Sequence, residues 1–277
     1  MSKVDERDNR RSRMDILPSS PILLFDSGLG GLSVLEEVRK AVPDAPIIYA
    51  ADTAGLPYGE KTEAEIAARV AGLLGRMSER YAPRLICIAC NTASTIALGM
   101  VRSVLQVPIV GTVPAIKPAA VITRTGTIGL LGTAATIRQS YVDDLEAQFA
   151  ADKRLIRYAA PELVGAAETK LRGGRPDDAV FAKAVAGLRT QAGGEAIDTV
   201  VLACTHFPLL ADELRAAMGP DISFVHGAEG IARRIRSLTI GQEFGRDRDD
   251  SAIVTGPVDP ALSAAVFSYG LRTVASL

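Results

Sequence analysis

The chain has 277 residues whose 31 basic and 32 acidic side chains nearly cancel, so no basic field attracts a phosphate backbone and nucleic acid is not an expected partner. Hydrophobic residues make up 48% of it, enough to bury a sizeable core in one or two domains. Its apolar runs are of strand length, well short of the roughly 20 residues that cross a bilayer, so no membrane span is expected.

The first 20 residues, MSKVDERDNRRSRMDILPSS, are dense in charge of both signs and lack the apolar stretch of a signal peptide. We expect residues 1–20 to form a disordered tail and the protein to be cytoplasmic. Three cysteines in such a chain do not make a disulfide framework, and no CxxC or Cys/His cluster has metal spacing. Reduced thiols and no metal are therefore expected.

Short apolar runs rich in β-formers alternate along the chain with Ala-rich amphipathic stretches. The runs predict strands at 21–26, 46–51, 84–89, 107–111, 126–132, 155–159, 198–203, 222–225 and 252–255. The stretches between them predict helices near 31–41, 62–80, 93–105, 136–151, 163–172, 178–192, 207–217 and 228–238. Because the strands are continuously apolar, helices should cover both faces of a parallel sheet, which predicts a doubly wound α/β fold.

Small polar groups follow four of the predicted strands. They are Asp26-Ser27-Gly28, Cys90-Asn91-Thr92, Gly132-Thr133 and Cys204-Thr205-His206. Ligands of doubly wound sheets collect at the carboxyl ends of the strands. The order, a turn motif and then a cysteine motif, occurs twice, which predicts two similar doubly wound domains that face each other across a cleft.

Two thiols on opposite walls of a cleft suit one kind of chemistry. A thiolate can take a proton from a carbon acid while a thiol on the other face returns one, and this inverts a stereocentre without a cofactor. A thiol has an unperturbed pKa of about 8.5, so roughly a tenth is ionised near pH 7.5. Helix N-termini after Cys90 and Cys204 would stabilise the thiolate, and Asp26 and His206 are the nearby groups that could relay protons.

Each of these residues also has a purely structural interpretation. Cys87, inside the run LICIA, is expected to be a small buried hydrophobe, and Cys90 could be another. His206 could bond the backbone at a helix start, and Asp26-Ser27 could cap the helix that begins near Gly31. Taken together, these residues indicate a catalytic site more strongly than any one of them does alone.

The glycines of SGLGGLS suggest an alternative, a dinucleotide-binding turn with Asp52 at the end of the next strand. The match is partial, since the third glycine position holds Ser33 and Asp26 would set a carboxylate close to a pyrophosphate. GxxxxGK[ST] is absent, which excludes a P-loop.

Six blocks, in the same order along the chain, resemble those of bacterial glutamate racemases. They are FDSGLGGLSVL (25–35), ADTAGLPYGEKT (51–62), ACNTAST (89–95), GTVPAIKPAA (111–120), GLLGTAATIRQSYV (129–142) and LACTHFPLL (202–210). The similarity runs over most of residues 21–240, and the paired CNT and CTH blocks make it specific. The PAIKPAA and RQSY forms resemble the branch of the family that carries an N-terminal extension.

The resemblance implies a cofactor-independent interconversion of L- and D-glutamate that supplies D-glutamate for peptidoglycan. It implies that Cys90 and Cys204 are the two acid/base groups, that Asp26 assists Cys90, and that Glu168 and His206 assist Cys204. The residues it implies for the glutamate site are Ser27, Pro57, Tyr58, Gly59, Asn91, Thr92, Thr133, Thr136 and Thr205.

The family also implies an interleaved domain arrangement, with residues 21–112 plus 228–277 in the first domain and 113–227 in the second. Its members commonly form homodimers, and a cell-wall precursor activates some of the branch with extensions. This chain departs from the family at His226, where an Asp is common, and its segment 241–277 is only loosely similar. We interpret His226 as a domain-hinge substitution outside direct contact with the substrate.

Two other functions stay open on the sequence. The same pair of thiols could racemise aspartate, because only side-chain reach separates the two substrates. Alternatively, the chain could be a catalytically silent amino-acid-binding regulator, although a binding protein would not need matched acid/base groups.

Overall fold

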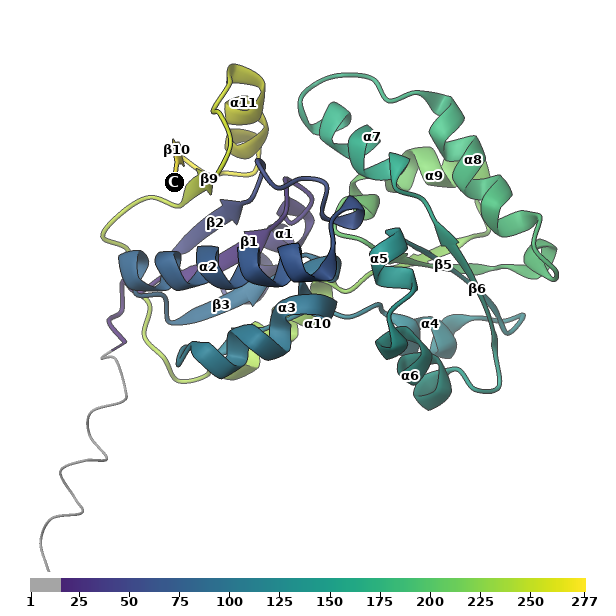
Figure 1. Ribbon diagram of the computed structural model, residues 1–277, viewed down its shortest axis with the longest axis horizontal. Helices are drawn as coiled ribbons and strands as arrows, with labels where there is room; N and C mark the ends of the chain where they lie inside the picture. The colour runs from purple at the N-terminus through teal and green to yellow at the C-terminus, as the bar shows by residue number, and fades with distance from the viewer. Residues whose placement is uncertain (1–15) are drawn as a thin grey trace, which may run out of the picture.

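The computed structural model describes residues 16–277, which form two parallel β-sheets with helices around them (Figure 1). The larger sheet has the order β10-β9-β2-β1-β3-β4, and the smaller one the order β6-β5-β7-β8. The strands of the larger sheet are β1 (Ile22–Asp26), β2 (Ile47–Ala51), β3 (Leu85–Ile88), β4 (Ile109–Val110), β9 (Ser251–Val254) and β10 (Thr273–Ser276). Those of the smaller sheet are β5 (Thr127–Gly132), β6 (Arg154–Ala159), β7 (Thr199–Ala203) and β8 (Ser223–Val225).

The two sheets repeat one strand order. The segment β2-β1-β3-β4 of the larger sheet corresponds strand for strand to β6-β5-β7-β8, and every pairing is parallel. The cysteine-bearing strands β3 and β7 therefore occupy equivalent positions, as do β1 and β5. This arrangement confirms the prediction of two similar doubly wound α/β domains.

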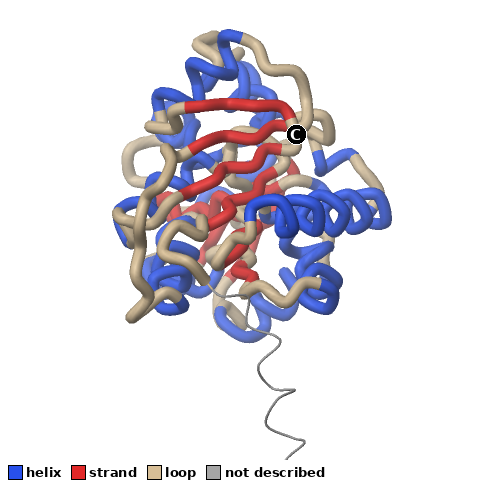
Figure 2. The backbone as a smooth tube through the Cα atoms, turned by 90° about the vertical axis from the view of Figure 1, so that its left-hand side faces the viewer, coloured by secondary structure: helices blue, strands red, loops and turns tan. Residues whose placement is uncertain are grey.

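The helices cover both faces of each sheet, as Figure 2 shows for the larger one. With the larger sheet lie α1 (Leu32–Ala41), α2 (Glu63–Tyr81), α3 (Asn91–Val104), α10 (Ala228–Leu238), α11 (Pro260–Ser268) and the 3₁₀ helix η2 (Tyr58–Glu60). With the smaller lie α4 (Ile116–Ile122), α5 (Ala134–Ile137), α6 (Ser140–Phe149), α7 (Glu162–Leu171), α8 (Asp178–Arg189), α9 (Ala211–Met218), and the 3₁₀ helices η3 (Gly194–Ala196) and η4 (Phe207–Leu210).

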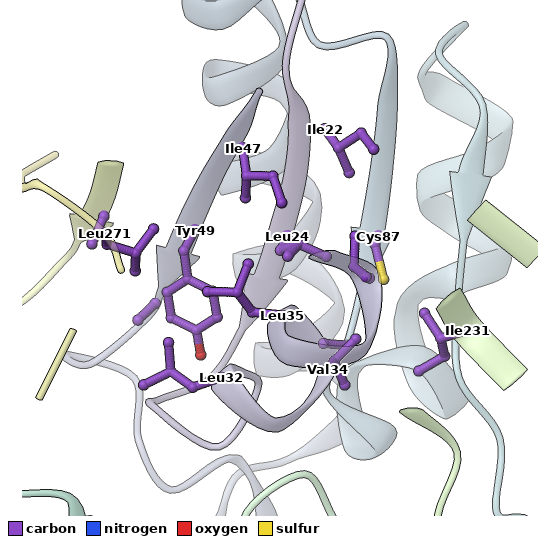
Figure 3. Packing of buried hydrophobic residues seen from close by; sticks show 14 of the residues in the cluster. Ile22, Leu24, Leu32, Val34, Leu35, Ile47, Tyr49, Cys87, Ile231 and Leu271 are labelled. Atoms are coloured by element: carbon purple, nitrogen blue, oxygen red, sulfur yellow. The ribbon is translucent and has the colours of Figure 1, made fainter. Parts of the chain in front are cut away.

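The core explains why the strands are continuously apolar. In β1, Ile22 and Leu24 pack with α1 and α10 on one face of the sheet, while Leu23 and Phe25 pack with α2 and α3 on the other. Each such side chain contributes roughly 1.5–3 kcal/mol when fully buried. Cys87 lies inside the first of these clusters, next to Leu24 in Figure 3, and is completely buried as predicted.

Sheet membership fits the predicted division of the chain. The strands before residue 112 and after residue 228 belong to the larger sheet, and those between belong to the smaller one. Helix α10 packs on α1 in the larger sheet's core. The boundaries at 112/113 and 227/228 stay predictions.

All nine predicted strands are present, but some helices differ. Helix 136–151 is divided into α5 and α6, because Gln139 has an extended backbone, and the helix expected at 207–217 begins as η4 with Pro208 in its first turn. The sequence pattern missed β10, α4 and α11. Within residues 16–277, no helix has both the length and the apolar character needed to cross a membrane.

Residues 16–20 were predicted to belong to the disordered tail, yet they are bound to the body of the protein. Arg84, with 2% of its surface exposed, extends its guanidinium among backbone and side-chain oxygens. Its acceptors are the carbonyls of Leu17, Pro18, Ser20 and Glu243 and the side chain of Gln242, at 2.7–3.1 Å. The predicted tail thus extends too far into the chain, and its residues 1–15 lie outside the described part.

Replacing Arg84 by Met should lower the free energy of unfolding by about 2 kcal/mol or more, because the buried carbonyl of Ser20 and several part-buried acceptors lose a charged donor. Urea denaturation measures the change. The control is Arg76→Met on α2, where the arginine is exposed. Equal stability of the two variants would contradict this account of the N-terminal segment.

Candidate active site

The two cysteines follow equivalent strands, and both are buried, with exposed fractions of 5% for Cys90 and 8% for Cys204. Cys90 is the N-cap of α3, and its Sγ accepts a hydrogen bond from the N–H of Ala93 at 3.5 Å. The hydroxyl of Ser27 lies 3.6 Å from the same sulfur. Cys90 therefore has the helix N-terminus that the sequence predicted.

Cys204 differs from Cys90 in its local backbone. It follows β7 directly, and the helix predicted after it begins as η4 at Phe207 with His206 at the N-cap position, so Cys204 itself does not cap a helix. Its partner is instead a side chain, since Sγ lies 3.8 Å from Nδ1 of His206. The other ring nitrogen of His206, Nε2, lies 2.8 Å from Oε1 of Glu168. A chain of three side chains thus runs from sulfur to carboxylate.

The electrostatics of this chain favour a charged pair. Burial alone would lower the pKa of His206, but its hydrogen bonds to Cys204 and Glu168 outweigh burial and hold that pKa well above its ordinary value. Burial alone would raise the pKa of Glu168, yet the hydrogen bond and charge of His206 hold it below its ordinary value. The raised pKa favours the protonated form, in which Nε2–H faces Glu168 and Nδ1–H faces Cys204, although the N–H of Gly30 also points at Nε2, at 3.2 Å.

The surroundings of Cys90 are different. Burial raises the pKa of the Cys90 thiol, and the nearby carboxyl of Asp26 adds to the effect. Asp26 is itself fully buried, which raises its pKa, and it accepts from the N–H of Gly31 at 2.8 Å and from the hydroxyl of Thr205 at 3.3 Å. No hydrogen bond joins Asp26 to Cys90 in the described structure, where Ser27 is the side chain next to the sulfur.

Several hydrogen bonds join the segments that follow β1 to segments that follow β6 and β7. The N–H of Leu29, after β1, donates to Oε1 of Glu168 at 2.7 Å. The hydroxyl of Ser33, in α1, donates to the carbonyl of Thr205 at 3.0 Å. The carboxyl ends of the two sheets are therefore in direct contact.

Hydroxyl groups form a second cluster between the sheets. Thr92 at the start of α3, Thr133 after β5 and Thr136 in α5 lie within hydrogen-bond distance of one another, at 3.0–3.2 Å. The Cα of Gly59 packs so close to Thr133 that an added Cβ would lie 3.0 Å from the threonine Cβ. All four residues were predicted to line the glutamate site.

The remaining predicted binding residues lie around these two clusters. Pro57 precedes η2, and the hydroxyl of Tyr58 donates to Asp52 at 2.6 Å. Asn91 and Thr205 line a small cavity that Cys204 also lines. The structure thus brings the predicted residues to the junction of the two sheets.

The glycines of SGLGGLS serve close packing between the domains. A Cβ on Gly28 would come within 2.6 Å of Glu168 Oε1, and one on Gly30 within 2.5 Å of His206 Nδ1. Asp52 accepts from Tyr58, Thr255 and Arg69. These contacts leave no place for a pyrophosphate or a ribose, so the dinucleotide interpretation is wrong.

Sequence reasoning missed some groups that complete the site. The N–H of Leu29, the Asp52 carboxylate that holds Tyr58, and Arg172, which lies 3.7 Å from Glu168, all depend on contacts distant in sequence. Only the i,i+4 spacing of Glu168 and Arg172 could have been noticed. Within residues 16–277, no three His, Cys, Asp or Glu side chains are grouped as a metal site requires.

A larger cavity of about 590 Å³ lies at the junction of the two domains. Its lining includes the cationic residues Lys117, Arg233 and Arg234 and the aromatic residues Tyr141, Phe149 and Phe224. His226 lines both this cavity and the small one at Cys204, its Nδ1 is buried without a hydrogen-bond partner in the described structure, and burial lowers its pKa. His226 thus lies closer to the site than a purely hinge position would require.

Comparison with known proteins agrees with this geometry. Residues 31–235 match the family model described as Asp/Glu/Hydantoin racemase. The glutamate racemase of Sphingopyxis alaskensis is 65% identical over 227 residues, which cover 82% of this chain and 85% of that protein. The glutamate racemase of Sodalis glossinidius is 42% identical over 90% of this chain and 88% of its own length.

Solved structures show the same fold. Escherichia coli glutamate racemase, in complex with L-glutamate and the activator UDP-MurNAc-Ala, matches with a TM-score of 0.85 and 38% identity over 93% of this chain and 98% of its own. A glutamate racemase isoform from Bacillus anthracis matches with a TM-score of 0.81 and 25% identity over 94% and 98%. The chain therefore belongs to the Asp/Glu/Hydantoin racemase family, among its bacterial glutamate racemases, and is an amino-acid racemase.

Proposed function

We propose that this protein interconverts L- and D-glutamate without a cofactor, using Cys90 and Cys204 as the two acid/base groups. The observation that carries the proposal is the placement of the two thiols at equivalent strand ends of two sheets whose carboxyl ends meet. Glutamate is favoured as substrate because the relatives compared above are glutamate racemases.

In the proposed reaction, one sulfur takes the Cα proton as a thiolate and the opposite thiol delivers its own proton to the other face of the carbanion. The product has the inverted configuration, and the two sulfurs have exchanged protonation states. Positively charged His206 lies beside Cys204, where negative charge develops when the thiol ionises. Cys90, whose burial favours the neutral thiol, is ready to act as the acid.

Two thiols alone do not account for an enzyme's rate. General acid–base groups contribute roughly 10²- to 10⁴-fold each, and enzymes commonly reach 10⁶-fold or more. We assign the remainder to stabilisation of the substrate carboxylates by the hydroxyls of Ser27, Thr92, Thr133, Thr136 and Thr205, and to exclusion of water. We assign Asn91 and the Pro57–Gly59 turn to the same site.

Access to the thiols requires movement of the domains. With 5% and 8% of their surfaces exposed, and with a cavity of only about 10 Å³ at Cys204, the two cysteines leave no room for glutamate in this arrangement. We therefore propose that glutamate enters when the sheets separate and that their return desolvates the thiolate.

The wider role that we propose is the supply of D-glutamate for peptidoglycan in the cytoplasm, by a protein that forms homodimers. The cavity of about 590 Å³ is our proposed site for an activator like the one bound to the Escherichia coli relative. Its cationic side chains suit a diphosphate, and its aromatic rings offer stacking surfaces.

Replacing either Cys90 or Cys204 by Ala should lower the rate of glutamate racemisation by roughly 10²-fold or more, because each direction needs one base and one acid. The control is Cys87→Ala, which should keep turnover and lose about 1 kcal/mol of stability, the cost of removing one small buried group. Optical rotation assays from both enantiomers of glutamate and of aspartate measure the effect. If the wild type turned over aspartate but not glutamate, the protein would be an aspartate racemase. If the wild type bound glutamate without turnover, it would be a catalytically silent binding protein.

The two histidines of the chain should titrate on opposite sides of the ordinary value of 6.5 in an NMR titration, His206 above it and His226 below. Glu168→Gln should shift the His206 midpoint down, whereas the control Glu229→Gln should shift only His226. His206 contributes stability at pH below 6.5 that is lost as pH rises through its raised pKa. Glu168 contributes stability above 4.5 that is lost as pH falls through its lowered pKa. A His206 midpoint near 6.5 in both the wild type and the Glu168→Gln variant would contradict the charged pair of His206 and Glu168.

Replacing Arg233 and Arg234 together by Ala should raise the UDP-MurNAc-Ala concentration needed for half-maximal activation about tenfold or more, because two cations that face the diphosphate are lost. The rate without activator should be unchanged. Arg236→Ala, an exposed arginine on the same helix outside the cavity, is the control. Equal activation of both variants would exclude this cavity as the activator site.

A further inference from the structure

Glu168 uses its two carboxylate oxygens differently. Oε1 lies 2.7 Å from the N–H of Leu29 and 2.8 Å from Nε2 of His206. Oε2 is buried and has no hydrogen-bond partner in the described part of the chain. Nε of Arg172, the residue that caps the C-terminal end of α7, lies 3.7 Å from Oε2. The carboxylate is thus fixed on one side and faces a cation on the other.

The same guanidinium reaches the other domain. Nη1 of Arg172 donates to Oδ2 of Asp259 at 2.8 Å. Asp259 is the N-cap of α11, between β9 and β10 of the larger sheet, whereas Arg172 follows α7, between β6 and β7 of the smaller sheet. In Figure 1, α7 and α11 lie on the same side of the molecule. The ion pair therefore spans the two domains on the side of α7 and α11.

We propose that Arg172 is a positioning residue that couples domain closure to the orientation of Glu168, with Asp259 as its contact in the opposite domain. The proposal rests on the role assigned above to the Glu168–His206–Cys204 chain. When the domains are together, Asp259 holds the guanidinium so that Nε faces Oε2. When they separate, Arg172 loses this contact, and Glu168 also loses the N–H of Leu29.

The geometry favours this role over a merely stabilising ion pair. Arg172 and Asp259 are 30% and 47% exposed at the side chain, and ion pairs with such exposure add little to folding stability. Glu168 is only 10% exposed, so a charge facing it is less screened by solvent. A guanidinium can present Nε to one carboxylate and Nη1 to another, which the single ammonium group of lysine cannot do with the same geometry.

The charged and titratable groups that interact electrostatically with Glu168 come from several elements. They are His206 before η4, Asp26 in β1, Tyr49 in β2 and Arg172 after α7. Burial works to raise the pKa of Glu168, while His206 and Arg172 work to lower it. Loss of the Arg172 charge therefore raises this pKa, so the ionised carboxylate is lost at a higher pH.

The test is a double-mutant cycle of Arg172→Gln and Asp259→Asn, assayed for glutamate racemisation across pH. Asn keeps the N-cap function at position 259, so helix α11 is preserved. Arg172→Gln should lower kcat/KM about tenfold or more, the scale of a small displacement of a catalytic group, and should move the acid limb of the pH profile to higher pH. Asp259→Asn should lower kcat/KM less, and the double variant should fall no further than Arg172→Gln alone.

The control is Gln139→Ala, because Gln139 makes another contact between the domains, donating to Glu63 at 2.7 Å, without touching Glu168. It should leave kcat/KM within about twofold and the acid limb in place, since isolated surface contacts are weak. Urea denaturation of each variant separates a loss of stability from a loss of positioning.

Three results would overturn the proposal. They are an Arg172→Gln variant with unchanged kcat/KM, an acid limb that does not move, and an Asp259→Asn effect that adds fully to that of Arg172→Gln. Failure of the underlying role of Cys204 is distinguishable, because the Cys204→Ala variant would then keep its rate of glutamate racemisation.

Discussion

The structure depends on one constraint: parallel strands deliver everything that follows them to a single edge of the sheet, and two such edges meet here. In both sheets the first strand lies between the second and the third. Asp26 and Cys90 therefore lie at the ends of neighbouring strands in one sheet, and Thr133 and Cys204 at the ends of neighbouring strands in the other. Each sheet supplies one thiol and one turn at its topological switch point. The two similar domains can then place one thiol on each face of the substrate Cα.

The two walls are alike in topology and unlike in electrostatics. Cys90 lies at a helix N-terminus beside a hydroxyl and a buried carboxyl, and its pKa is raised by burial. Cys204 lies beside His206, whose pKa is raised by its hydrogen bonds to Cys204 and to the buried Glu168. In the proposed mechanism, this difference makes Cys90 the neutral acid and places the His206–Glu168 relay beside Cys204. Both cysteines are nearly buried where the two sheets meet, so the catalysis that we propose requires the domains to open and close.

Much of the fold and part of the site could be predicted from sequence, for identifiable reasons. Strands buried on both faces leave unbroken apolar runs, so β1, β3 and β7 were evident, and polar residues after them marked the thiols. Glu168 was found only through family resemblance, because it lies within a helix whose neighbours are ordinary core residues. The partners Leu29 and Asp52 could not be found, since their contacts exist only after the chain has folded, and Arg172 had only its i,i+4 spacing from Glu168 as a signal. Residues 16–20 were wrongly predicted to be part of the disordered tail, because Arg84, which binds their carbonyls, is distant in sequence.

The most direct test of two bases on opposite faces is the early incorporation of deuterium during turnover of L-glutamate by the wild-type protein in D₂O. Mass spectrometry of the separated enantiomers measures it before equilibrium is approached. The account predicts deuterium at Cα of the D-glutamate formed, with the remaining L-glutamate still protonated, because the proton removed and the deuteron delivered belong to different thiols. Equal labelling of both enantiomers, or product that keeps the substrate's own proton, would contradict it and indicate a single base.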